Sequence, residues 1–203
     1  MTTIGKAIEF AIGAHGDATR KGKSRPYILH PLEAMNIAAG LTKDEDVLAA
    51  AVLHDVVEDT DVKEAEIREV FGDRVADLVM AESEDKMRHF SSEESWTARK
   101  QATIDHLAEL GRDALLICLG DKLANLREIS RDYAALGDRL WERFNQKDKT
   151  KHAWYYSSIF RILADRLGQV PAIREYRALL KEVFGTEEGA DGRESTAEKE
   201  SDA

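Results

Sequence analysis

The sequence has few of the residues that interrupt helices or form cross-links. Only three prolines and one cysteine occur among its 203 residues, so an internal disulfide is impossible. It lacks an apolar run long enough to cross a bilayer, and its N-terminus shows no signal-peptide pattern. It also lacks a glycine-rich phosphate loop of the Walker or dinucleotide type. These absences favour a soluble, cytoplasmic protein that holds any phosphate with side chains or a cation.

The net charge of −10 argues against a protein that binds nucleic-acid polymers, because phosphate backbones are held mainly by clustered basic residues. Half of this charge lies in residues 186–203, which contain seven acidic and two basic side chains and no aromatic ring. A segment with so little apolar surface cannot offset the entropy lost on folding. We therefore predict one folded domain over residues 1–185 and a disordered acidic tail over residues 186–203.

The spacing of apolar residues predicts an all-α fold, a single helical bundle. Residues that favour helices are abundant, and no clear run of alternating apolar and polar residues suggests a strand. Cys118 lies in an apolar run and is expected to be buried. The helices are expected at residues 3–15, 31–40, 43–58, 63–71, 73–83, 96–110, 113–130, 149–167 and 170–184.

Four polar side chains interrupt the apolar run from Ala51 to Thr60. They are His54, Asp55, Glu58 and Asp59, and a helix through this run would place them one turn apart on one face. Burying carboxylates without partners is unfavourable, so a bound cation is the simplest reason to group them. The run therefore predicts a metal site.

Two further segments add polar groups that packing does not explain. His30 precedes Pro31, and Asp121 follows a long apolar run. Together with His54 and Asp55, they supply two imidazoles and two carboxylates, a donor set suited to Mn²⁺, Fe²⁺ or Zn²⁺. The absence of thiolate ligands favours Mn²⁺ slightly.

Seven motifs resemble those of the HD-domain phosphohydrolases and, among them, the alarmone hydrolases of the Rel/Spo type that act on (p)ppGpp. The resemblance covers residues 4–168 and implies an HD-domain bundle. It also indicates a small member with a hydrolase domain alone. The motifs are Ala14–His15, Arg20–Gly22, Pro26–Pro31, Leu53–Thr60, Phe71–Gly72, Leu78–Val79 and Asp121–Arg127.

The resemblance implies that His30, His54, Asp55 and Asp121 bind Mn²⁺ and that an acidic pair is catalytic. That pair is Glu58 and Asp59. A carboxylate within reach of a water beside a cation can accept its proton, and Glu58 follows His54 by one helical turn. For Asp59, a purely structural role in the turn at Thr60 remains the alternative.

The resemblance also implies a set of substrate-binding residues. An arginine-lysine pair would hold the purine, an asparagine would lie beside the sugar and base, and a lysine would lie near the phosphates. A planar guanidinium stacks well on a purine. For the two tyrosines of the set, packing and substrate contact remain open. The set comprises Arg20, Lys21, Tyr27, Lys86, Asn125 and Tyr155.

We therefore predict an Mn²⁺-dependent enzyme that removes pyrophosphate from the 3′ position of (p)ppGpp. Its partner would be a small nucleotide rather than a polymer or a membrane, and its oligomeric state stays open. The main alternative is a phosphatase for another nucleotide, such as ppApp, NADPH or a nucleoside monophosphate, because Gly120 and Ala124 depart from the family pattern near the base. A nucleotide sensor without turnover would not need Glu58 and Asp59. A purely structural helical protein would not explain the polar run.

Overall fold

The structure is a computed structural model that describes residues 2–20, 22–83 and 95–185. The predicted all-α fold is confirmed, since these ranges hold no strand and only an isolated bridge between Thr19 and Pro26. None of the helices described there is long and apolar enough to cross a membrane. The elements are α1 (Thr3–His15), α2 (Leu29–Ala39), α3 (Glu45–Leu53), α4 (Val56–Asp59), α5 (Glu64–Phe71), α6 (Asp73–Glu82), α7 (Trp96–Glu109), α8 (Arg112–Leu136), the 3-10 helix η1 (Gly137–Arg143), α9 (Lys149–Leu167) and α10 (Pro171–Phe184).

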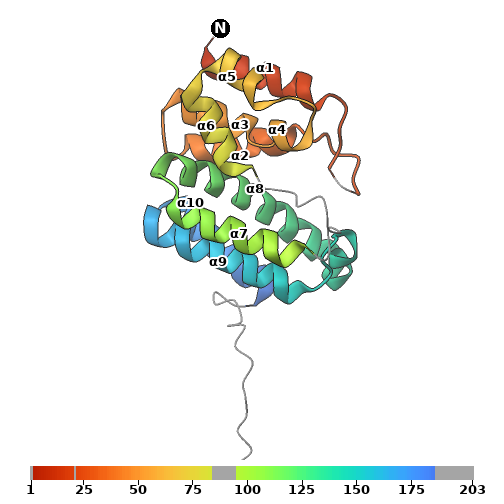
Figure 1. The fold of residues 1–203 in the computed structure, drawn as a ribbon. Helices are drawn as coiled ribbons and strands as arrows, with labels where there is room; N and C mark the ends of the chain where they lie inside the picture. The colour runs from red at the N-terminus through yellow and green to blue at the C-terminus, as the bar shows by residue number, and fades with distance from the viewer. Residues whose placement is uncertain (1, 21, 84–94, 186–203) are drawn as a thin grey trace, which may run out of the picture.

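The long helix α8 is the centre of the bundle (Figure 1). Helices α1 to α6 lie on one side of it, and α7, α9 and α10 lie on the other. Its most extensive packing is against α2, and it also contacts α3, α6, α9, α10 and η1. A residue on α8 can therefore face elements from both halves of the chain.

Local signals explain several helix ends. Thr2 caps α1 by accepting a hydrogen bond from the Gly5 amide, and Asp148 caps α9 by accepting one from Thr150. Pro171 occupies the first turn of α10, where its missing N–H has no cost. The predicted bounds 3–15 and 149–167 coincide with those of α1 and α9.

The helix predicted over residues 43–58 is instead two helices, and this prediction was wrong. Helix α3 ends at Leu53, the chain turns at His54 and Asp55, and the short helix α4 begins at Val56. The helix predicted to end at residue 130 continues to Leu136 and is followed directly by η1. His54 and Asp55 therefore lie in a turn between two helices, and Glu58 and Asp59 lie on the second of them.

Two features of the core bear on the site. The segment from Ala114 to Asp121 of α8 is buried, and Cys118 is buried within it, as expected. Gly120 packs directly on α2, where a Cβ added to it would lie 2.5 Å from the carbonyl oxygen of Ala34. Only glycine permits this helix-helix distance, so α2 and α8 approach closely beside Asp121. The predicted tail, 186–203, lies outside the described residues, and the division at residue 185 stays a prediction.

Candidate metal centre and adjoining cavity

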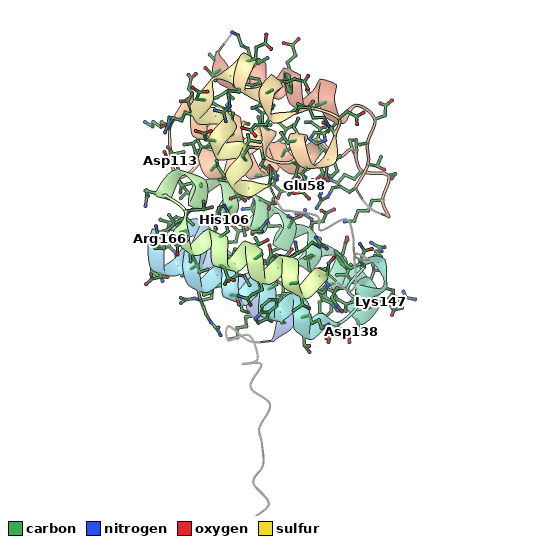
Figure 2. The ribbon with its side chains drawn as sticks, in the orientation of Figure 1. Glu58, His106, Asp113, Asp138, Lys147 and Arg166 are labelled. Atoms are coloured by element: carbon green, nitrogen blue, oxygen red, sulfur yellow. The ribbon has the colours of Figure 1, made fainter. Side chains whose placement is uncertain are left out.

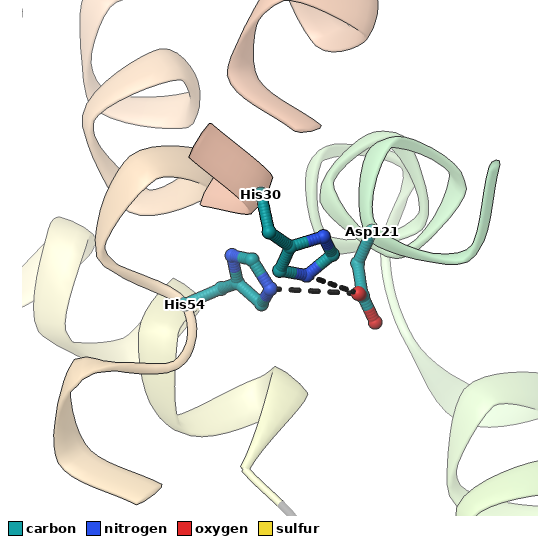
Figure 3. A group of neighbouring side chains, drawn as sticks. All are labelled: His30, His54 and Asp121. Atoms are coloured by element: carbon teal, nitrogen blue, oxygen red, sulfur yellow. Dashed lines mark ion pairs between the residues drawn. The ribbon is translucent and has the colours of Figure 1, made fainter. Parts of the chain in front are cut away.

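Three of the four predicted ligands meet in the core (Figure 3). His30 comes from α2, His54 from the turn after α3, and Asp121 from α8. Their nearest donor atoms all lie within 4.8 Å of one another. The Oδ1 atom of Asp121 is 3.0 Å from His30 Nε2 and 3.5 Å from His54 Nε2. One position between these atoms could thus hold a cation.

Asp55, the fourth predicted ligand, lies beside this group. Its Oδ2 atom is 3.1 Å from His54 Nε2 and 3.5 Å from His30 Nε2. The two carboxylates therefore face the same pair of imidazole nitrogens. Burial raises the pKa of Asp55, but the neighbouring His54 outweighs this effect and holds it below its usual range.

The hydrogen bonding of His54 suits a cation ligand. Its Nδ1 atom lies 2.9 Å from the carbonyl oxygen of Ala51, and because a carbonyl can only accept, Nδ1 must carry a proton. Its Nε2 atom is buried and faces Asp55 Oδ2 at 3.1 Å and Asp121 Oδ1 at 3.5 Å. Burial lowers the pKa of His54, but Asp55 and Asp121 together raise it well above its usual value. The carboxylates thus favour positive charge beside Nε2, which a proton or a divalent cation can supply.

Asp121 is fixed by two neighbours on its own helix. The amide of Asn125, one turn further along α8, donates to Asp121 Oδ1 over 2.6 Å. The ammonium group of Lys122 donates to the other oxygen, Oδ2. Burial raises the pKa of Asp121, but Lys122 and the two histidines lower it well below its usual range. The carboxylate therefore stays ionised and ready to bind a cation.

Tyr27 connects the predicted ligands to the predicted catalytic pair. Its hydroxyl oxygen lies 2.6 Å from Asp55 Oδ2 and 2.7 Å from Asp59 Oδ2. Its ring packs against His15 at 4.7 Å between centroids, and the Arg20 guanidinium lies over it at 5.4 Å. Burial and the two carboxylates raise the pKa of Tyr27, so the hydroxyl stays protonated. The structure thus gives Tyr27 a contact within the protein, whereas the sequence left packing or substrate contact open.

The predicted catalytic pair lies on the short helix α4. Glu58 is half-buried (Figure 2). Asp59 is exposed and is the last residue of the helix. Thr60 Oγ1 donates to the Val56 carbonyl and accepts from the Val62 amide, so the turn has its own cap. Thr60 thus supplies a cap of this turn, while Asp59 accepts a hydrogen bond from the Tyr27 hydroxyl, and a structural role for Asp59 remains the alternative.

A cavity of about 300 Å³ adjoins the predicted ligands. Asp59, Tyr27 and Asn125 line it, and the last two also bond to Asp55 and Asp121. Its walls come from the loop before α2, from α4, α8, η1 and α9. The complete lining comprises Arg20, Lys23, Tyr27, Asp59, Asn125, Glu128, Ile129, Asp132, Leu140, Arg143, Phe144 and Tyr156. A volume of this size is at the lower end of those that bind small molecules.

Charged side chains of the cavity form a network. Arg20 donates to Asn125 Oδ1 over 2.6 Å and to Glu128 Oε2 over 2.9 Å. Lys23 lies 2.6 Å from both Glu128 and Asp132. Burial raises the pKa of Glu128, but Lys23 and Arg20 lower it to about 2. Through Asn125, this network reaches Asp121.

Some of the other predicted substrate residues line the cavity and others do not. Arg20 and Asn125 line the cavity, whereas Lys21 and Lys86 lie outside the described residues. Tyr155 is buried away from the cavity lining, and its hydroxyl has no hydrogen-bond partner among the residues described. Its neighbour Tyr156 lines the cavity instead.

Sequence reasoning missed several cavity residues. Glu128 follows Asn125 by three positions, so helical spacing could have suggested that both face the same side of α8. Lys23 belongs to the basic loop that already supplied Arg20. By contrast, nothing in the sequence indicated that Arg143 and Phe144 of the later segment fold back onto this loop.

Comparison with known proteins gives a consistent set of relatives. The family model of the HD domain matches residues 7–170. A guanosine-3′,5′-bis(diphosphate) 3′-pyrophosphohydrolase of Aquifex aeolicus is 37% identical over 165 residues, covering 81% of this chain and 21% of the relative. The enzyme of the same name called MESH1 from Danio rerio is 36% identical over 129 residues, covering 62% of this chain and 68% of that protein.

Two solved structures share the fold. One is a metazoan ortholog of SpoT that hydrolyses ppGpp, with a TM-score of 0.66 and 26% identity, covering 91% of this chain and 95% of the other. The second is a Listeria monocytogenes EGD-e protein, with a TM-score of 0.67 and 31% identity, covering 77% and 99% respectively. The chain spans about a fifth of the length of the Aquifex aeolicus relative.

Proposed function

The chain belongs to the HD-domain family, and on that basis we propose that it is a metal-dependent hydrolase of (p)ppGpp. It would remove the 3′-pyrophosphate and leave GDP or GTP. One observation carries the proposal: the donor atoms of His30, His54 and Asp121 lie together, with Asp55 beside them, next to a cavity of about 300 Å³. Relatives named for this activity include those from Aquifex aeolicus and Danio rerio.

These four residues would hold a divalent cation, and we propose Mn²⁺. Two imidazole nitrogens and two carboxylates without a thiolate form a donor set of borderline to hard character. The buried Nε2 of His54, which faces both carboxylates, and the ionised Asp121 both fit this role. When bound, such a cation supplies Lewis acidity that polarises a phosphate and lowers the pKa of water.

Glu58 and Asp59 would act as the proton acceptors of the reaction. Both lie on α4, which begins directly after the ligand Asp55. Asp59 lines the cavity, and the Tyr27 hydroxyl holds its carboxylate. A carboxylate in this position can orient an attacking water and take its proton. Hydrolysis of the bond to the ribose 3′ oxygen then releases pyrophosphate.

Arg20 and Asn125 would bind the nucleoside. Both line the cavity, and the hydrogen bond between them fixes the guanidinium of Arg20 beside the Tyr27 ring. Asn125 also bonds to Asp121, so it lies where a ribose attached to the reacting phosphate would pass. Lys21, Lys86 and Tyr155 remain proposed substrate contacts on the family resemblance alone.

The deciding experiment is product analysis with metal-stripped protein. It would be incubated with ppGpp, ppApp and NADPH at equal concentration, with and without added Mn²⁺. The proposal expects GDP and pyrophosphate only with Mn²⁺, formed fastest from ppGpp. Release of phosphate from NADPH without turnover of ppGpp would retain the metal site and overturn the assigned substrate.

A further inference from the structure

The segment from Gly137 to Phe144 has no role in the proposed reaction, yet it forms one wall of the cavity. It consists of η1 and the residue after it, and three of its side chains line the cavity: Leu140, Arg143 and Phe144. This wall lies in the half of the bundle that contributes none of the four proposed ligands. The segment therefore adds contacts to the cavity that are independent of the metal site.

The wall is held in place by Trp141. Its side chain is 3% exposed and stacks on His152 at 5.0 Å and on Phe184 at 5.7 Å between ring centroids. It also contacts the rings of Tyr133 and Phe144, at 6.1 and 5.9 Å. A ring packed on four others has little freedom to move. The backbone that carries Arg143 and Phe144 is therefore held in place by the packing of Trp141.

Arg143 has fewer and longer polar contacts than the two other described cations that line the cavity. Arg20 and Lys23 each make contacts of 2.6 to 2.9 Å with two side chains. Among the residues that the structure describes, Arg143 has an ion pair with Asp132 alone, at 3.4 Å, and its side chain is 37% exposed. Such a long, partly exposed pair is weak, and a guanidinium has five N–H donors. Arg143 therefore has donors to offer a ligand without breaking a strong ion pair.

The positive and negative side chains that line the described part of the cavity are equal in number. Its described cations, Arg20, Lys23 and Arg143, are matched by three carboxylates, on Asp59, Glu128 and Asp132. A bound phosphate group adds negative charge to the cavity. It therefore needs a cation whose existing ion pair is weak and can be broken at little cost. Arg143 is that cation.

The position of Arg143 indicates which part of a nucleotide it meets. Its stem passes the basic loop before α2, where a Cβ added to Gly22 would lie 3.9 Å from Arg143 Cδ. Asp59, Tyr27 and Asn125 mark the side of the cavity nearest the proposed ligands, and Arg143 belongs to the η1 wall. In a nucleotide the 3′ and 5′ oxygens leave the ribose at different ends. When the 3′-phosphate is at the ligands, the 5′-phosphates extend away from them.

We propose that Arg143 binds the 5′-phosphates of the nucleotide and so makes the site selective for 5′-phosphorylated nucleosides. This inference rests on the proposed function, because it needs the 3′ group at the metal site. The planar guanidinium suits a phosphate through two parallel hydrogen bonds. Arg143 would thus be a binding residue, with no part in the bond that is broken.

The test is the affinity of the Mn²⁺-loaded protein for GDP and for guanosine, measured by calorimetry. GDP is the product of the proposed reaction and differs from guanosine only by the 5′-diphosphate. Arg143→Ala should weaken GDP binding by about 10- to 100-fold, the range for a lost charge-assisted pair, and change guanosine binding less than about twofold. Arg143→Lys should give an intermediate loss. Arg139→Ala is the matched control, an exposed arginine of the same 3-10 helix that does not line the cavity.

The outcomes separate this inference from the proposed function. A selective loss for GDP in Arg143→Ala, with Arg139→Ala unchanged, supports the inference. Equal losses for both ligands, or no loss, overturn it and leave the proposed function standing. A wild-type protein that binds neither ligand overturns both. The KM for ppGpp should rise in Arg143→Ala with kcat nearly unchanged, which a general disturbance of the site would not produce.

Discussion

The Tyr27 hydroxyl and the Asp59 carboxylate are in hydrogen-bond contact, with 2.7 Å between the hydroxyl oxygen and Oδ2. The same hydroxyl is 2.6 Å from Asp55 Oδ2. A single O–H group therefore joins a proposed cation ligand to a proposed proton acceptor. It would position the proposed acceptor relative to a bound cation without being a ligand itself.

Replacing Tyr27 with phenylalanine should lower kcat and leave the bound metal in place. The ring would keep its contacts with His15 and Arg20, and only the hydrogen bonds to the carboxylates would be lost. A hydrogen bond to a charged group contributes about 1.5–3 kcal/mol, so we expect a decrease of about 10- to 100-fold. Steady-state kinetics and metal analysis would measure both effects. Unchanged kcat in Tyr27→Phe would refute the positioning role.

Two variants separate the metal ligands from the proton acceptor. His54→Ala should lose bound metal and turnover together, because Nε2 of His54 faces both carboxylates of the site. Glu58→Gln should keep the metal and lose about 10²- to 10⁴-fold in kcat, the usual contribution of a general base. Elemental analysis and kinetics on the same samples provide the comparison. Normal turnover by Glu58→Gln would rule out its assigned role.

Substituting Gly120 with alanine should destabilise the protein although alanine favours helices. The added Cβ would lie 2.5 Å from the Ala34 carbonyl oxygen, so α2 and α8 must separate. Such overpacking costs about 1–3 kcal/mol, which exceeds the helix preference of about 1 kcal/mol. Because His30 and Asp121 lie on these two helices, metal affinity should fall as well.

The matched control for that change is Gly13→Ala. Gly13 is an exposed residue of α1, and a Cβ there would meet nothing within 4 Å. This variant should be more stable than the wild type by up to about 1 kcal/mol. Chemical denaturation of both variants tests the contrast, and equal effects at the two glycines would contradict the steric argument.

Glu128 should make folding stability depend on acid pH. Its pKa is about 2 in the folded protein, against an ordinary value of 4.5. A lowered pKa stabilises the fold above the ordinary value, and this contribution disappears as the pH falls from 4.5 to 2. After allowance for solvent screening, we expect about 2 kcal/mol. Glu128→Gln should remove this pH dependence. Urea unfolding at about three to four pH values between 2.5 and 6 would measure the free energy of unfolding of both proteins.

Glu142→Gln serves as the control for the acid experiment. Its carboxylate pairs with Lys147 at 3.3 Å, but both side chains are more than 60% exposed. Exposed pairs contribute little to stability. The unfolding curve of Glu142→Gln should therefore follow the wild type across the same pH range, and a matching loss in both variants would contradict the assignment to Glu128.

The sequence was most informative where local signals decide the structure. Capping residues and apolar spacing gave the bounds of α1 and α9, and the low proline content agreed with an all-α fold. The break at His54 was not predictable, because no glycine or proline marks it. The turn brings the two proposed ligands His54 and Asp55 to face His30 and Asp121, which are distant in sequence, so the break depends on tertiary contacts.

At the candidate site, too, residue types could be predicted from the sequence, whereas contacts that depend on tertiary packing could not. His30, His54 and Asp121 were grouped from their residue types, and the structure brings their donor atoms together. The choice between Tyr155 and Tyr156 as a cavity residue depends on how α9 is rotated about its axis, which periodicity did not determine. The contact of Tyr27 with Asp55 joins residues 28 positions apart and comes from the tertiary fold.

The proposed ligands come from α2, from the turn between α3 and α4, and from α8, so they are far apart in any unfolded chain. A cation held by all of them would bind the native state and not the denatured state. At a free concentration of 100 times its Kd, it would add about 2.7 kcal/mol to the free energy of unfolding. Metal supply would then control how long the enzyme survives proteolysis as well as how fast it works, since cleavage usually proceeds through opened states.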